Sequence, residues 1–156
     1  MALSLWVNGA PDADQPHVRS LTIELTPLAP GDACELPLPL TMVPDGGVEI
    51  GRVSGDLSGF GQKLSSSCLG ATPDVFVAMH LDQPRDLSAR LATATASALP
   101  ALELRRTCAA TAVPSCATAA LPGAGAVLQV PALPAGDYLF RIGNAGEWTL
   151  DVTLVP

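Results

Sequence analysis

The C-terminal stretch from Pro131 to Pro156 constrains the fold more than any other part of the chain. Residues 148–154 alternate apolar and polar side chains, which is the period of a strand with one buried face. Residues 138–142 form a second short apolar run, and Gly-Asn-Ala-Gly at 143–146 separates the two. Because glycine and asparagine reach positive φ at little steric cost, the stretch predicts a closing β-hairpin.

Composition extends this expectation to the whole chain. Fifteen prolines and fourteen glycines in 156 residues favour many short segments joined by turns, as in a β-sandwich or barrel. The length allows one domain with a proper core. Aromatic residues make up only 4% of the chain while hydrophobic residues make up 48%, so we expect a core of aliphatic side chains.

Residues 3–26 predict a second hairpin at the N-terminus. Its second strand, SLTIELTP at 20–27, resembles TLDVTLVP at 149–156 in both register and final proline. We interpret it as the tail of a preceding repeat, which divides the chain into residues 1–28 and a β-sandwich domain at 29–156. Chance similarity between two amphipathic hairpins is the alternative.

About eight strands are expected in the domain, at the spacing of a sandwich. The clearest alternates Val75, Val77, Met79 and Leu81 on one face. A proline-interrupted segment at the start of the domain fits only an edge strand. The predicted strands are residues 36–41, 48–52, 74–81, 87–91, 98–106, 127–130, 138–142 and 148–154.

The chain has four cysteines, Cys34, Cys68, Cys108 and Cys116, which allow three pairings. The absence of a C-x-x-C motif, and of histidines near the cysteines in sequence, argues against zinc. Each of the pairs Cys34–Cys68 and Cys108–Cys116 brackets a loop-like stretch, so we expect these two disulfides and an oxidising compartment. Free buried thiols in a cytosolic protein are the alternative.

Several short motifs follow one another in a recognisable order. They are D-x-C at 32–34, Cys68 ahead of P-D-V at 73–75, L-x-L-R-x-x-C at 102–108 with Cys116 as partner, L-x-A-G-x-Y at 133–138, and G-x-W-T-L-x-V at 146–152. In this order and in its cysteines the chain resembles the bacterial pre-peptidase C-terminal domain, in the cysteine-bearing form of secreted proteins. The resemblance covers about residues 31–156.

That resemblance implies a jelly-roll-like β-sandwich, here with the extra N-terminal hairpin. Members of the family are non-catalytic appendages of secreted enzymes and surface proteins, and some bind polymers such as collagen. The family usually carries an acidic C-N-D-D run after its fourth cysteine, whereas Ala-Thr-Ala-Ala follows Cys116 here. Calcium binding is therefore not carried over to this chain.

The sequence offers no convincing catalytic group. Gly-Asp-Leu-Ser-Gly at 55–59 has the wrong spacing for a nucleophile elbow. His80 lies on the opposite face of its predicted strand from Val77 and Met79, so it is expected to face solvent, and His17 lies in a proline-flanked loop. We expect no enzyme activity and no cofactor.

Metal and ligand candidates are equally sparse. Asn8, Asp12 and Asp14 cluster in the N-terminal turn, but only two are charged and no bidentate glutamate follows, so we interpret them as a solvated turn and expect no metal site. Trp148 has the parity of the buried positions of its strand. Trp6 has the opposite parity from its apolar neighbours, which makes it the candidate ligand contact.

The net charge and the hydropathy of the chain limit the kinds of partner that we expect. A net charge of −7 with a single lysine provides no basic patch for nucleic acid. No apolar run approaches the roughly 18 residues of a membrane span, and the first ten residues lack the basic region of a signal peptide.

Two functions follow as hypotheses. The first is a non-catalytic accessory repeat of a larger secreted or cell-surface protein, serving adhesion, polymer targeting or spacing, with an extracellular polymer or neighbouring repeats as partners. The alternative is a structural subunit of an extracellular fibre or oligomer, assembled by β-strand sharing through residues 3–26.

Overall fold

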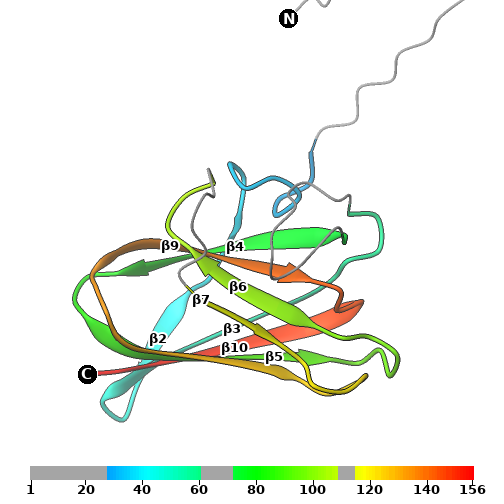
Figure 1. Cartoon of the computed structure of the whole chain (residues 1–156). Coiled ribbons are helices and arrows are strands. Elements are labelled where there is room, and N and C mark those ends of the chain that lie inside the picture. The colour runs from blue at the N-terminus through cyan, green and yellow to red at the C-terminus, as the bar shows by residue number, and fades with distance from the viewer. Residues whose placement is uncertain (1–27, 61–71, 109–114) are drawn as a thin grey trace, which may run out of the picture.

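Two five-stranded sheets pack face to face in the computed structural model of the chain, which describes residues 28–60, 72–108 and 115–156 (Figure 1). Sheet A has the order β1 (Leu38–Pro39), β4 (Asp74–Leu81), β9 (Gly136–Gly143), β6 (Ala101–Arg105), β7 (Ser115–Thr118). Sheet B has the order β2 (Met42–Asp45), β3 (Val48–Asp56), β10 (Glu147–Val155), β5 (Arg85–Thr93), β8 (Ala126–Leu133). The all-β sandwich expected from the sequence is confirmed; the predicted N-terminal hairpin at residues 3–26 lies outside the described residues.

The predicted closing hairpin is wrong. β9 pairs with β4 and β6 in sheet A, whereas β10 pairs with β3 and β5 in sheet B. The turn residues do adopt the expected conformation, with φ of 53° at Asn144 and 60° at Gly146, but they form a corner between the sheets. A Cβ at Gly146 would lie 2.3 Å from Thr95 Oγ1, so glycine is required there for space as well as for φ.

The described residues contain ten strands where about eight were expected. The predicted edge segment 36–41 contains only the two-residue β1, which joins sheet A at its edge in parallel with β4, and the next strand, β2, which pairs with β3 in sheet B, was not predicted. Gly46 and Gly47, with φ of 57° and 95°, form the tight turn from β2 to β3. β7 was not predicted, because four residues of weak apolar pattern carry little strand signal.

The inner faces of the two sheets form one aliphatic core. Val75, Val77, Met79 and Leu81 all point into it, as the alternation in the sequence predicted. Trp148 is 3% exposed and belongs to the same cluster, which confirms it as a core residue. Period-two patterning therefore identified the buried faces of β4 and β10 correctly.

Tyr138 fixes the entry to β9. Its hydroxyl donates a hydrogen bond to the carbonyl of Pro134 at 2.7 Å and accepts one from Arg106 Nη2 at 2.7 Å. The L-x-A-G-x-Y motif thus closes the connection from β8 to β9.

Among the described residues, no helix is long and apolar enough to cross a membrane.

Candidate functional site

The cysteines pair differently from the expectation. Cys34 is bonded to Cys108, with their Cα atoms 5.6 Å apart, and Cys116 is also disulfide-bonded. Both predicted pairs, Cys34–Cys68 and Cys108–Cys116, are therefore wrong. Bracketing a loop in sequence did not identify the partner, since the bond joins the segment before β1 to the segment after β6. Cys68 lies outside the described residues.

The segment containing Cys34 covers the outer face of sheet A, on the side away from sheet B (Figure 1). We call residues 29–36 the cover segment; three backbone hydrogen bonds fold it into consecutive turns. Its Gly31 carbonyl accepts a hydrogen bond from the amide of Phe76 at 3.0 Å, at the edge of β4. Its Cys34 is tied to Cys108, beyond the end of β6, and β9 lies between these two strands.

Four charged side chains are buried on that covered face. Asp74, Glu103 and Arg141 are fully buried and Arg105 is 2% exposed. Arg141 Nε donates to Asp74 Oδ2 at 2.5 Å, and Arg141 Nη1 lies 3.4 Å from Glu103 Oε2. Glu103 also accepts a hydrogen bond from Arg105 Nε. We call these four residues the ion network; it links β4, β9 and β6 across the sheet.

The outer face of sheet B is different, because exposed and half-buried side chains line it from edge to edge. One row across the strands reads Val43, Ile50, Thr153, Ser88, Gln129. The next row reads Arg52, Asp151, Arg90, Val127. Arg52 Nε donates to Asp151 Oδ1 at 2.5 Å, but the two side chains remain 73% and 39% exposed.

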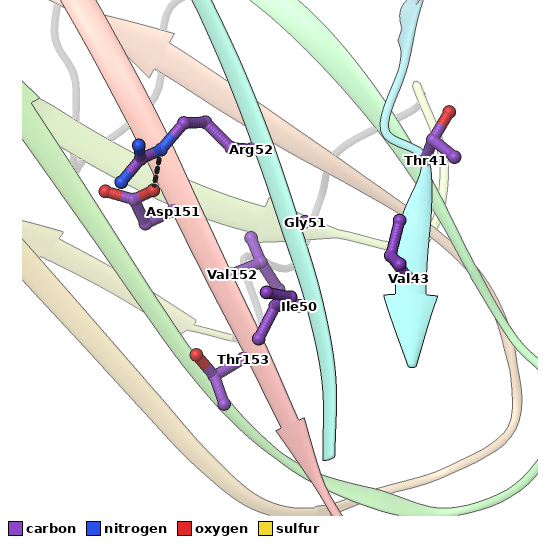
Figure 2. Close-up of a pocket in the computed structure, with 8 residues that line it drawn as sticks. All are labelled: Thr41, Val43, Ile50, Gly51, Arg52, Asp151, Val152 and Thr153. Atoms are coloured by element: carbon purple, nitrogen blue, oxygen red, sulfur yellow. Dashed lines mark hydrogen bonds and ion pairs between the residues drawn. The ribbon is translucent and has the colours of Figure 1, made fainter. Parts of the chain in front are cut away.

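A shallow groove of about 790 Å³ runs over β2, β3 and β10 on this face (Figure 2). Val43 and Ile50 supply its apolar side and are 54% and 41% exposed. The Arg52–Asp151 pair and Thr153 supply its polar side. The groove presents aliphatic, hydroxyl and charged groups together, which suits contact with an extended partner.

His80 lies at the end of β4 and is exposed, as the sequence predicted. Its Nδ1 lies 2.6 Å from Asp137 Oδ1 and its Nε2 lies 3.3 Å from Asp82 Oδ1. The hydrogen bond to Asp137, aided by the charges of both aspartates, raises the pKa of the imidazole. Because the side chain is 62% exposed, we interpret the cluster as a surface charge group.

Ser58, from the Gly-Asp-Leu-Ser-Gly stretch considered above, lies in a turn after β3. Ser58 donates through Oγ and through its amide to Asp56, which lowers the pKa of that carboxyl, so the pair closes a turn after β3. Within residues 28–60, 72–108 and 115–156, no group of three or more His, Cys, Asp or Glu is arranged to hold a metal ion. Trp6, Asn8, Asp12, Asp14 and His17 lie outside the described residues.

Sequence reasoning missed the ion network entirely. The available signal was the placement of Asp74, Glu103 and Arg141 within strongly apolar strands, each at an outward-facing position.

Comparison of the chain with protein-family models and with curated proteins found no match.

Proposed function

We propose that this chain is a non-catalytic accessory β-sandwich repeat of a larger secreted or cell-surface protein. It contacts an extracellular polymer or a neighbouring repeat through the outer face of sheet B. The resemblance to the pre-peptidase C-terminal domain supports the class of protein, and the Cys34–Cys108 disulfide is consistent with an oxidising compartment.

One observation carries the proposal: the two outer faces of the sandwich are built differently. Sheet A buries charged groups on its outer face, whereas sheet B leaves Val43, Ile50 and Val127 exposed there. Exposed apolar side chains on a face that also carries charged and hydroxyl groups mark an interaction surface. The groove over β2, β3 and β10 offers both apolar and polar lining to a ligand, which fits polymer targeting.

Co-sedimentation with insoluble polymers tests the proposal, with cellulose, chitin, peptidoglycan and fibrillar collagen as probes. Thr153→Arg fills the groove with a bulky charge. Thr118→Arg, at an exposed position of β7 in the other sheet, is the matched control. We expect at least one polymer to pellet the wild type and the Thr118 variant, and to lose about tenfold in affinity for the Thr153 variant. Equal binding by all three proteins would overturn the assignment of the groove, and binding of none to any polymer would rule out a polymer as the partner.

The alternative, assembly by strand sharing, is favoured by one feature of sheet B. β2 pairs with β3 only from Val48 to Gly51, so residues 52–56 pair only with β10 among the described strands. An edge of this kind accepts an added strand, and residues 3–26 are the candidate donor. Size-exclusion chromatography with light scattering distinguishes the two proposals, because strand sharing predicts oligomers that deletion of residues 1–28 converts to monomers.

A further inference from the structure

We propose that the outer face of sheet B binds an acidic polysaccharide, one that carries a carboxylate or a sulfate on every second sugar, through Arg52 and Arg90. This ligand class rests on the proposed function, because it specifies the polymer that the same face contacts. We call Arg52, Asp151 and Arg90 the arginine row; they lie on β3, β10 and β5.

The arginine row crosses three neighbouring strands at one level of the sheet. Asp151 is directly opposite Arg52 on one side and Arg90 on the other. All three side chains point outward, since the residues that flank Asp151 and Arg90 along their strands belong to the core. Because β10 lies between β3 and β5, the Cα atoms of the two arginines are about 10 Å apart. That separation is close to the repeat of an extended β-linked disaccharide, so a polymer along the row brings every second sugar to an arginine.

Both arginines have donors available for an anion. Arg52 bonds to Asp151 through Nε, and its side chain remains 73% exposed (Figure 2). Arg90 is exposed and forms no ion pair or side-chain hydrogen bond within the described part of the chain. A Cβ added at Gly125 would lie 3.9 Å from Arg90 Nε, so this side chain extends toward the start of β8, away from Asp151. An arginine donates two parallel hydrogen bonds to a carboxylate, and sulfate oxygens accept in the same way.

The arginine row is positive although the whole chain has a net charge of −7. Two arginines and one aspartate leave the row with one positive charge in excess. The next outward-facing charged residues along the same strands are Asp56, Glu147 and Asp86, each four residues from the row, or about 13 Å. That distance exceeds the Debye length of about 8 Å at physiological ionic strength, so these carboxylates do not cancel the attraction of the row for an anion.

Uncharged hydrogen-bonding side chains flank the row on both sides. Ser54 and Thr149, whose hydroxyl oxygens lie 3.0 Å apart, are on one side. Thr153, Ser88 and Gln129 are on the other. Hydroxyl and amide groups both donate and accept, as the hydroxyl groups of sugars do. An extended peptide would instead add to a sheet edge through its backbone, so the lining of this face favours a polysaccharide over an acidic peptide.

The absence of an aromatic platform favours an acidic polymer over a neutral one. Exposed aromatic rings supply much of the contact energy when an open protein surface binds uncharged sugar rings. Among the described residues, the aromatic side chains are buried or, for Phe60, packed against the core; they are Phe60, Phe76, Tyr138, Phe140 and Trp148. The charges of the arginine row are therefore the main attraction that this face offers to a polymer.

Affinity measurements of the full chain on immobilised polymers test this ligand class. The probes are hyaluronan, which has one carboxylate per disaccharide, its uncharged methyl ester, and κ-carrageenan, which has one sulfate per disaccharide. We expect the wild type to bind at least one acidic polymer about tenfold more tightly than the ester. The affinity should fall between about 0.01 M and about 0.1 M salt, as the Debye length shortens from about 30 Å to about 10 Å. Binding to hyaluronan alone assigns a carboxylate, and binding to κ-carrageenan alone assigns a sulfate.

Variants locate the binding to the row. Arg90→Gln should weaken binding at least about fivefold, because it removes a charged donor pair. The matched control, Thr118→Asp, makes the same change of net charge at an exposed position of β7 and should bind like the wild type. Thr153→Glu takes the place of Thr153→Arg with these probes, since an added arginine would itself attract them, and it should also weaken binding.

Three results would contradict the acidic polysaccharide. Equal affinity for hyaluronan and its ester, without binding to κ-carrageenan, would show that charge is not recognised. Equal losses in Arg90→Gln and Thr118→Asp would mean that net charge, rather than the row, sets the affinity. Binding of cellulose, chitin or collagen that Arg90→Gln leaves unchanged would overturn the ligand class while the proposed function stands. Binding of no polymer at all would exclude both this ligand class and a polymer as the partner.

Discussion

The outer faces of sheets A and B use the same residue types to opposite effect. On sheet A, Arg141 pairs with two carboxylates and is fully buried. On sheet B, Arg52 pairs with one carboxylate and is largely exposed. Breaking the buried ion pair costs much stability, because removing one partner leaves the other charge buried without it. Breaking the exposed pair costs little, because water solvates the remaining charge. Burial, rather than the pairing itself, decides what an arginine contributes to this fold.

The comparison also assigns a role to each face. The outer face of sheet A carries a buried network of charges that links β4, β9 and β6, so we interpret that face as structural. The open face of sheet B keeps side chains of several kinds accessible, and it is the face that we propose for binding.

The largest expected difference between the faces comes from the two arginines. Arg141→Ala should lower the free energy of unfolding by about 3–5 kcal/mol, because it removes the ion pairs that Arg141 makes with the buried Asp74 and Glu103. Arg52→Ala, the control on sheet B, should leave stability unchanged within error. Urea denaturation monitored by Trp148 fluorescence measures both. Comparable losses in the two variants would show that the outer faces do not differ as described.

An apolar pair gives a smaller contrast. Phe76 lies on the covered face and is fully buried, whereas Ile50 on sheet B is 41% exposed. Phe76→Ala should cost about 3 kcal/mol through the cavity that it leaves, and Ile50→Ala less than about 1 kcal/mol. The same denaturation curves report the two values. A costly Ile50 substitution would mean that its face is covered in solution.

The smallest expected effect is the pH dependence of stability that comes from His80, whose exposed side chain lies beside two aspartates. Its pKa is raised in the folded chain, so protonated His80 adds stability that is fully present below the unfolded pKa and is lost as pH rises through the folded pKa. Asp137→Asn should therefore lower the pKa of His80, as followed by NMR titration. Asp82→Asn should lower it less, because its contact is longer and it contributes less to the shift. A larger shift in the Asp82 variant would reverse this assignment.

The sequence predicted the features that depend on neighbouring residues alone. Period-two alternation identified the inward faces of β4 and β10, because successive side chains of any strand point to opposite sides. Gly-Asn-Ala-Gly at 143–146 correctly predicted residues at positive φ, although the hairpin expected there is wrong. The expected all-β sandwich followed from strand and turn spacing. Trp148 was correctly assigned to the core for the same reason.

Only the tertiary structure decided which strands and cysteines become partners. A strand with one apolar face can bury it within a hairpin or across a sandwich, so β9 and β10 could not be assigned to separate sheets from their pattern. Cys34 and Cys108 lie 74 residues apart in sequence and became neighbours because the chain crosses sheet A between them. The outward positions of Asp74, Glu103 and Arg141 are those of a solvent-exposed face, yet all three side chains are fully buried, and no local pattern of the sequence encodes that burial.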